Sequence, residues 1–209
     1  MGVKEILVKF CSFLNKHNFS YVIVGGIAAI LLGVRRATMD IDVIIDIKNK
    51  EELLKLCDLL KEINFYTPKE WALSAFEEKT HFTIFTGGFV HIDVKFPINN
   101  LDFSTLRRRI RIYIDNTPVF VSPLEELIAS KLCLLQSLKD VEDALQLMYI
   151  HLNRIDWKYL FTLIGKDPLV YANRILDDIL REFKDNKDVI VRIKRAKSLK
   201  SKIEETLEH

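Results

Sequence analysis

The stretch from Tyr21 to Asp46, YVIVGGIAAILLGVRRATMDIDVIID, is the feature that most constrains the fold of this chain. An apolar run ends at a Gly-Gly pair, a short segment typical of a helix follows, and a second apolar run carries Asp40 and Asp42. Side chains alternate faces along a strand, so both carboxylates should project from one face, roughly 6.5–7 Å apart. The stretch therefore predicts a strand, a turn, a short helix and a second strand that presents two acids.

The two acids lie in an apolar setting. Ile41 separates them and the run Val43-Ile44-Ile45 follows, which is typical of a core strand and not of a solvated acidic loop. Desolvation and like-charge repulsion both raise the free energy of neighbouring carboxylates unless a cation lies between them. This favours a divalent metal ion bound by Asp40 and Asp42. The alternative is that they are ordinary strand-end charges that face solvent.

Gly25 and Gly26 end the predicted strand Tyr21–Val24 and begin the predicted helix. The first N–H groups of a helix lack partners within it and the helix dipole is positive there, so a phosphate binds favourably. Glycine also lets a phosphate approach the backbone closely. The pair predicts a phosphate-binding turn beside the acids; the alternative is a pair needed only for helix–sheet packing.

Together these motifs resemble the signature of the polymerase-beta-like nucleotidyltransferase superfamily. The resemblance rests on Gly25-Gly26, thirteen intervening residues and Asp40-Ile41-Asp42, with Arg36-Ala37-Thr38-Met39 just before the acids. It implies an α/β (α+β) fold in which a mixed sheet is flanked by helices and followed by a helical C-terminal module. It also implies transfer of a nucleoside monophosphate from an NTP to a hydroxyl acceptor, with release of pyrophosphate.

Asp93 is the third acid that the resemblance implies. In this superfamily an acid from a later strand completes the metal-binding set, and Asp93 in His91-Ile92-Asp93-Val94 matches it. Three acids imply two Mg²⁺ ions about 3.5–4 Å apart, one lowering the pKa of the incoming hydroxyl and the other binding the triphosphate. An unpaired carboxylate between apolar residues would be costly. The alternative for Asp93 is therefore an ion pair with Lys95 or His91.

Arg36 and Thr38 precede the acids, and the resemblance assigns them to the nucleotide site together with Gly25 and Gly26. If the second strand begins at Thr38, the threonine hydroxyl shares the face of Asp40. Arg36 either binds a phosphate or neutralises the acids, and both interpretations remain open.

From Ser122 onward the sequence predicts helices. Ser122-Pro123-Leu124-Glu125 combines a capping serine, a proline at the first helical position and a glutamate three residues after the cap. We predict a nucleotidyltransferase core over residues 1–121 and a helical C-terminal module over residues 122–209. The final Leu207-Glu208-His209 resembles the start of an expression tag and is given no structural meaning.

Lys131, followed by Asp140 and Asp143, resembles the corresponding segment of the abortive-infection and type IV toxin branch of the superfamily. There a lysine followed by an Asp-x-x-Asp pattern supports the nucleotide site, which implies that Lys131 contacts the γ-phosphate. The alternative is a purely structural salt bridge, because the two acids share a helix face. This branch also implies a toxin with a cognate antitoxin as its partner.

Two more helices and a loop are expected in the first part of the chain. An apolar stripe predicts a helix from Val3 to Asn15, and Asn49 can cap a helix that runs to Asn64. Trp71 falls in a segment predicted as a loop, where it is either a core or rim aromatic or stacks on a base.

Two hairpins are also expected. Gly87-Gly88 lies between alternating runs that start at His81 and Phe89, which predicts a tight turn between two strands. Runs over 109–114 and 119–121 predict a second hairpin through Asp115-Asn116-Thr117-Pro118.

Composition is that of an ordinary globular protein, with 49% apolar and 29% charged residues and a net charge of +2. The longest apolar run, Val22 to Val34, is too short to span a bilayer and contains three glycines. Because no signal peptide is recognised at the N-terminus, we expect a cytoplasmic protein. The cysteines lack metal-ligand spacing and are expected to be buried small apolar residues: Cys11, Cys57 and Cys133.

The acceptor cannot be read from the sequence and could be RNA, protein or a small molecule. Two basic clusters, Arg107 to Arg111 and Arg192 to Lys202, are either solvated charge or a docking surface for RNA. A non-catalytic module that binds a nucleotide or a partner on the same fold is the alternative to an enzyme.

Overall fold

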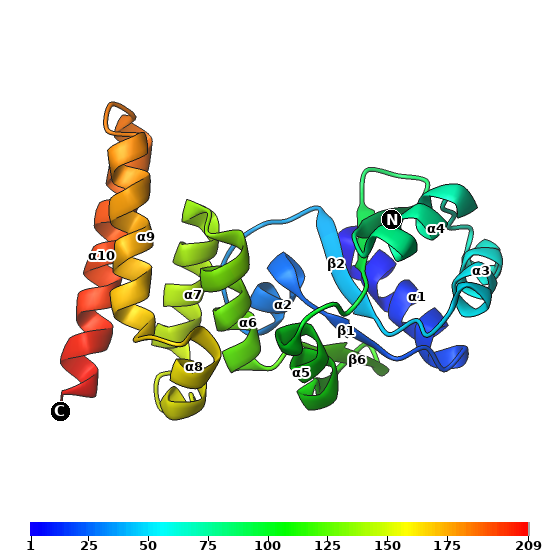
Figure 1. The fold of residues 1–209 in the computed structure, drawn as a ribbon, viewed down its shortest axis with the longest axis horizontal. Coiled ribbons are helices and arrows are strands. Elements are labelled where there is room, and N and C mark those ends of the chain that lie inside the picture. The colour runs from blue at the N-terminus through cyan, green and yellow to red at the C-terminus, as the bar shows by residue number, and fades with distance from the viewer. Residues whose placement is uncertain (209) are drawn as a thin grey trace. The chain divides into compact units, whose positions relative to one another are not determined.

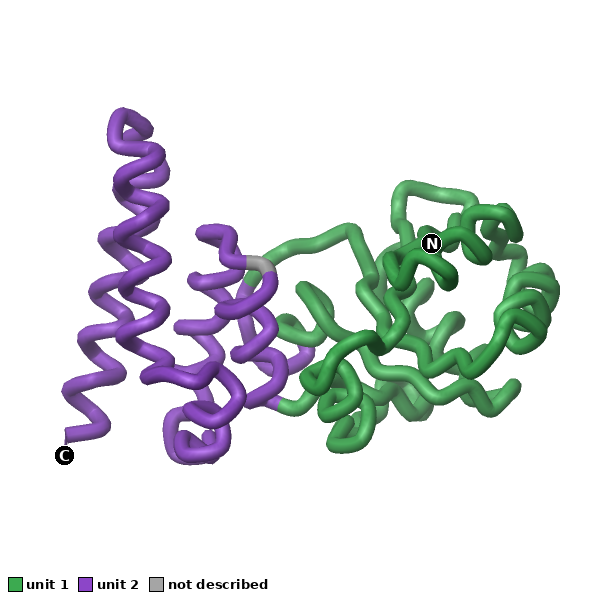
Figure 2. The backbone as a smooth tube through the Cα atoms, in the orientation of Figure 1, with its two compact units in different colours: residues 1–30, 36–123 green, residues 31–35, 124–209 purple. Residues whose placement is uncertain are grey.

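The computed structural model describes residues 1–208, apart from the side chain of Leu135; His209 of the tag-like tail lies outside the described residues. The chain divides into two compact units (Figure 2). Unit 1 comprises residues 1–30 and 36–123, and unit 2 comprises residues 31–35 and 124–209.

Unit 1 is built on a mixed sheet. Among the described residues the sheet has six strands in the order β3-β4-β2-β1-β6-β5. The pairs β2–β4 and β1–β6 are parallel, and the other neighbours are antiparallel. The predicted α/β class with a mixed sheet is therefore confirmed. The strands are β1 (Tyr21–Ile23), β2 (Asp40–Ile45), β3 (His81–Phe85), β4 (His91–Lys95), β5 (Ile110–Ile114) and β6 (Thr117–Val121).

Helices flank this sheet (Figure 1). They are α1 (Val3–Lys16), α2 (Gly25–Leu31), α3 (Lys50–Leu59), a 3₁₀ turn (Leu60–Ile63), α4 (Lys69–Glu78) and α5 (Asn100–Arg108). The Asn49 side chain accepts a hydrogen bond from the Glu52 N–H, which confirms the predicted cap of α3. Two predictions are wrong: α3 ends at Leu59 and not near Asn64, and Trp71 lies in α4 and not in a loop.

The two faces of the sheet differ in polarity. One face carries Ile41, Val43 and Ile45 of β2, all fully buried, and α1 contacts this sheet through its apolar stripe. On the other face Leu106 of α5 packs against Val22 and Ile44, which covers the end of β2 that follows the acids. The beginning of β2 carries Asp40 and Asp42 on this second face, because side chains alternate along a strand.

Both predicted hairpins are present, with different turns from those expected. The last pair of β3 with β4 is Phe85 with His91, so the first connection covers residues 86–90 and not the Gly-Gly pair alone; Phe89 belongs to it and is 90% exposed. The second turn is shorter: Asp115 and Asn116 both have positive φ and Ile114 pairs with Thr117. Two central residues with positive φ match the twist of the flanking strands, so β6 begins at Thr117.

Unit 2 is helical. Its elements are α6 (Leu124–Ser130), a π-helical turn (Lys131–Leu135), α7 (Leu138–Ile150), α8 (Trp157–Ile164), α9 (Pro168–Glu182) and α10 (Lys187–Leu207). The short segment 31–35 joins them, and the Leu32 carbonyl lies 2.7 Å from the His151 ring nitrogen. No helix of residues 1–208 is long and apolar enough to cross a membrane.

Candidate active site

The sheet register brings two of the three predicted acids together. Asp42 of β2 and Asp93 of β4 are directly paired residues of parallel neighbouring strands. Paired residues of adjacent strands project from the same face, and neighbouring strands are about 4.8 Å apart. Asp40 lies two residues before Asp42, so it shares that face, and its own partner in the register is His91. The second face of the sheet thus carries all three acids.

Asp93 is held by a threonine and not by a cation. The Thr83 hydroxyl of β3 donates a hydrogen bond of 2.7 Å to Asp93 Oδ1, and Thr83 is the register partner of Asp93. Lys95 instead pairs at 2.8 Å with the buried Asp102 of α5. The alternative in which Lys95 neutralises Asp93 is therefore wrong.

Gly25 is required by its contact with Asp42. A Cβ atom on Gly25 would lie 2.0 Å from Asp42 Oδ2 and 2.9 Å from Asp42 Cβ, and the backbone there has a φ of +62°. L-residues other than glycine adopt that conformation at a cost, and no side chain fits against the carboxylate. The Gly-Gly turn is thus built directly against the carboxylate of the second acid.

Arg36 and Thr38, which precede the acids in the sequence, both lie next to Gly26. A Cβ atom on Gly26 would lie 3.0 Å from Arg36 Nη2 and 3.3 Å from Thr38 Oγ1. The Thr38 hydroxyl also accepts a long hydrogen bond of 3.4 Å from the backbone N–H of Asp40. The structure therefore brings the predicted residues of unit 1 into one neighbourhood: the Gly-Gly turn, the Arg36–Thr38 segment and the acids.

The chemistry of this donor set suits a hard cation. Carboxylate oxygens are the protein ligands that Mg²⁺ prefers, and Asp42 and Asp93 start from adjacent positions on paired strands. Within residues 1–208, as their side chains lie, no group of three or more His, Cys, Asp or Glu residues is arranged to hold a metal ion. Binding of a metal ion by all three acids at this face would therefore require their side chains to be rearranged.

Lys131 lies in unit 2, in a buried ionic cluster. Its ammonium is 2.7 Å from Asp143 Oδ2 and 3.1 Å from Asp140 Oδ1, and its side chain is 1% exposed. Two of its three N–H donors are thus engaged by carboxylates of α7. The observed contacts are those of the structural salt bridge that was the alternative for Lys131.

The two basic clusters are largely engaged by neighbouring groups. In α10, Arg192 pairs with Glu142, Lys197 with Asp177 and Lys200 with Glu204. The hydrogen bonds that Arg192 donates to the Glu142 carboxylate raise the pKa of Arg192 above its ordinary value.

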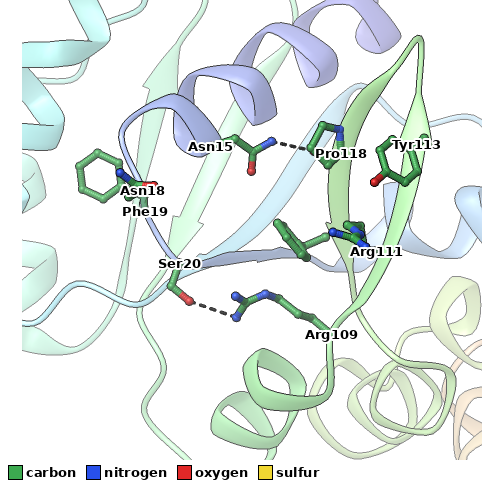
Figure 3. A pocket seen from close by; sticks show the side chains of 9 residues that line it. Asn15, Asn18, Phe19, Ser20, Arg109, Arg111, Tyr113 and Pro118 are labelled. Carbon is green, nitrogen blue, oxygen red and sulfur yellow. Dashed lines mark hydrogen bonds between the residues drawn. The ribbon is translucent and has the colours of Figure 1, made fainter.

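The other cluster contributes to a surface pocket of unit 1 (Figure 3). Arg109 donates to the Ser20 hydroxyl at 3.0 Å and lies over the Phe120 ring, while Arg111 lies over Tyr113. Ser20 precedes β1 and Gly25 follows it, so this pocket and the acids are at opposite ends of the strand.

The prediction that the cysteines are buried is confirmed at two of the three positions. Cys11 and Cys57 are buried, and Cys133 is half-buried. Burial raises the pKa of the Cys11 thiol to about 12 and that of Cys57 to about 11. These thiols are neutral at pH 7, as expected of small apolar residues in a core.

Thr83 is the residue of the site that sequence reasoning missed. Part of the signal was present in the apolar pattern: if Phe82 and Ile84 share a face with Ile92 and Val94, then Thr83 shares the opposite face with Asp93, and the register makes them direct partners. The aromatic residues near Phe85 were also not connected with the site, since Trp71 was assigned to a loop.

The fold and the arrangement of glycines and acids are those that the resemblance to polymerase-beta-like nucleotidyltransferases predicts. The crystal structure of ANT(2″)-Ia in complex with adenylyl-2″-tobramycin is similar, with a TM-score of 0.52 and 15% identity, covering 82% of this chain and 97% of that chain. A nucleotidyltransferase-like protein from Paracoccidioides brasiliensis gives 0.47 and 17% identity, with 91% of each chain covered. A CCA-adding enzyme with ATP gives 0.39 and 14% identity, with 83% of this chain and 51% of that chain covered. Of these three, the first supports the fold, and the fold alone.

The family follows from the sequence. A family model described as "Nucleotidyltransferase of unknown function (DUF6036)" matches residues 5–194. The match spans most of the chain, so this protein belongs to the DUF6036 family and is a nucleotidyltransferase. None of the curated proteins compared with it matches the chain. The resemblance of Lys131 and its partners to the toxin branch stays a prediction.

Proposed function

We propose that this protein is a Mg²⁺-dependent enzyme that transfers a nucleoside monophosphate from an NTP to a hydroxyl acceptor. The observation that carries the proposal is the pairing of Asp42 with Asp93 on adjacent parallel strands, with Asp40 on the same face. The reaction forms a bond between the acceptor oxygen and the α-phosphorus and breaks the bond from the α-phosphorus to the bridging oxygen. Pyrophosphate leaves and the acceptor hydroxyl loses its proton.

The residues of the chain position the reactants. Asp40, Asp42 and Asp93 would hold Mg²⁺, which when bound would lower the pKa of the acceptor hydroxyl and neutralise charge on the triphosphate. The Thr83 hydroxyl donates to Asp93 Oδ1 and so fixes the orientation of that carboxylate.

The phosphates are proposed to bind on the Gly-Gly side of Asp42. Gly25 and Gly26 leave no side chain between the backbone and the acids, and Arg36 lies against Gly26 with its guanidinium. A planar guanidinium is suited to two phosphate oxygens at once. The side chain of Thr38 fixes the start of β2 through the Asp40 N–H.

The hydroxyl class of the acceptor is proposed from the resemblance of the motifs. The similar ANT(2″)-Ia structure is a complex with adenylyl-2″-tobramycin, and its likeness to this chain is one of fold.

The test is transfer of label from an α-labelled NTP to total RNA, to protein and to small-molecule fractions. Wild type is compared with Asp42→Asn, which keeps the shape of the side chain and removes its charge. Asp115→Asn is the matched control, because Asp115 is an exposed turn residue paired with Lys4. We expect Asp42→Asn to lower the rate at least about 100-fold, Asp115→Asn to leave it unchanged, and EDTA to abolish transfer until Mg²⁺ is restored. Equal labelling by wild type and Asp42→Asn in every fraction would refute the proposal.

A further inference from the structure

An aromatic cluster continues the acid-bearing face of the sheet. Phe85 of β3 pairs with His91 of β4, and His91 pairs with Asp40 of β2, so the three residues form one row across the strands. Tyr66 extends the row through a β-bridge to Phe85. Neighbouring strands are about 4.8 Å apart, so the backbone of Phe85 lies roughly 10 Å from the backbone of Asp40. The backbone of Tyr66 lies roughly 14 Å from the backbone of Asp40.

The rings of this cluster are in contact and two of them are open to solvent. The Tyr66 and Phe85 rings stack at 5.2 Å, Trp71 meets Phe85 edge-on at 6.2 Å, and His91 meets Phe85 at 5.7 Å. Tyr66 is 57% exposed and Trp71 58% exposed. Large aromatic side chains are seldom left exposed as a group, so a contiguous set of them marks a binding surface.

One ring of the cluster shares a pocket with the hydrogen-bond partner of the third acid. Trp71, His81 and Thr83 line this pocket, and the Thr83 hydroxyl is the group that donates to Asp93. A ligand in contact with Trp71 in this pocket is therefore one residue away from the third acid.

The position of the cluster assigns it to the acceptor, provided that the proposed function holds. In the sheet order β3-β4-β2-β1 the acids lie between the Gly-Gly turn, which follows β1, and the aromatic residues at β3. The attacking and leaving oxygens of phosphoryl transfer lie roughly in line on opposite sides of the phosphorus. With the pyrophosphate on the Gly25 side, the incoming hydroxyl enters from the side of β4 and β3.

We propose that Tyr66, Trp71 and Phe85 form a stacking platform for the terminal bases of a single-stranded RNA acceptor whose 3′-hydroxyl reaches the acids. Planar bases stack on aromatic rings with little dependence on sequence. The row extends away from the acids over more than one ring, which suits successive bases better than a single small ring.

Tryptophan fluorescence tests the platform without any catalysis. The chain has two tryptophans, so Trp157→Phe leaves Trp71 as the single one. This variant is titrated with an oligoadenylate RNA pentamer in EDTA and without NTP. We expect saturable quenching of Trp71, an affinity about 5- to 100-fold weaker when Tyr66→Ala is added, and no change when Phe161→Ala is added. Phe161 is the matched control because it is a 50% exposed aromatic on α8 of unit 2.

Several outcomes separate this inference from the proposed function. Asp42→Asn is expected to bind the pentamer as wild type does while losing transfer. Absence of quenching, or equal weakening by Phe161→Ala, would refute the platform while leaving the nucleotidyltransferase proposal intact. If ATP alone quenches Trp71 and the pentamer does not displace it, the platform for the acceptor is refuted as well. The rings would then bind the base of the donor nucleotide. Circular dichroism of each variant checks that it is folded.

Discussion

Replacing Gly25 by alanine tests the central geometric claim, that the Gly-Gly turn is built against the Asp42 carboxylate. The new Cβ would lie 2.0 Å from Asp42 Oδ2, whereas an ordinary contact is about 3.5 Å, so the carboxylate must move by more than 1 Å. The Asp42 Cβ at 2.9 Å is attached to the strand itself, so the turn or strand must shift as well. The substitution therefore combines a strained backbone with an overpacked contact.

The expected magnitudes follow from these two effects. Alanine at positive φ costs roughly 1–2 kcal/mol of stability, and overpacking adds roughly 1–3 kcal/mol. We therefore expect Gly25→Ala to lower the free energy of unfolding by roughly 2–5 kcal/mol. A displacement of about 1 Å at a reacting group lowers the rate about 100-fold. NTP transfer should fall by at least that factor.

Gly165→Ala is the matched control for the backbone. Gly165 also has positive φ, at +74°, but nothing lies within 4 Å of a Cβ built there. Its replacement should cost only the backbone part, about 1–2 kcal/mol, with unchanged transfer. Urea unfolding gives the stability of each variant, and label transfer from NTP gives the activity.

A double-mutant cycle with Asp42→Ala isolates the clash. Removing the carboxylate takes away the two nearest atoms, so Gly25→Ala should cost at least about 1 kcal/mol less in that background. If Gly25→Ala costs no more than Gly165→Ala, or if the cycle shows no coupling, the turn does not pack on Asp42 as described.

Three further predictions address other parts of the chain. Thr83→Val keeps the shape of the side chain but removes the hydrogen bond to Asp93, so calorimetry should show Mg²⁺–NTP binding weakened 10- to 100-fold; unchanged binding would exclude a positioning role. Lys131→Met leaves its two carboxylate partners without their buried cation and should lower the free energy of unfolding by about 3–5 kcal/mol; a smaller loss in urea unfolding would argue against a structural cluster. Burial raises the pKa of Cys11 from 9.0 to about 12, so the thiol ionises first in the unfolded state and stability should fall between pH 9 and pH 12 by up to about 1.4 kcal/mol per pH unit. The slope should be shallower by that amount in Cys11→Ala, and identical slopes would contradict the assignment.

Local patterns in the sequence were sufficient for most elements. The apolar stripe of α1 and the cap at Asn49 are signals carried by adjacent residues, and both were found as predicted. The end of α3 was misplaced because the apolar pattern continues through a 3₁₀ turn, which Asn64 ends with positive φ. Trp71 was misassigned because α4 starts after Pro68 without a side-chain cap.

The sequence by itself determined which side chains could carry chemistry. Gly25, Gly26, Asp40 and Asp42 lie within one continuous stretch, where the period of a strand and the conformational freedom of glycine act on near neighbours. Their order was enough to predict a nucleotidyltransferase, which is what the description of the matched family gives.

Only the tertiary structure decided what surrounds those side chains. Asp93 comes next to Asp42 because β4 pairs in parallel with β2, and such pairing joins segments whose separation no local pattern encodes. The antiparallel pairing of β3 with β4 gave Asp93 its threonine partner and aligned Phe85 with the acids, and Asp102 of α5 became the partner of Lys95. Cross-strand partners are fixed by register across the whole sheet, because a slip of one residue would move every apolar side chain to the wrong face.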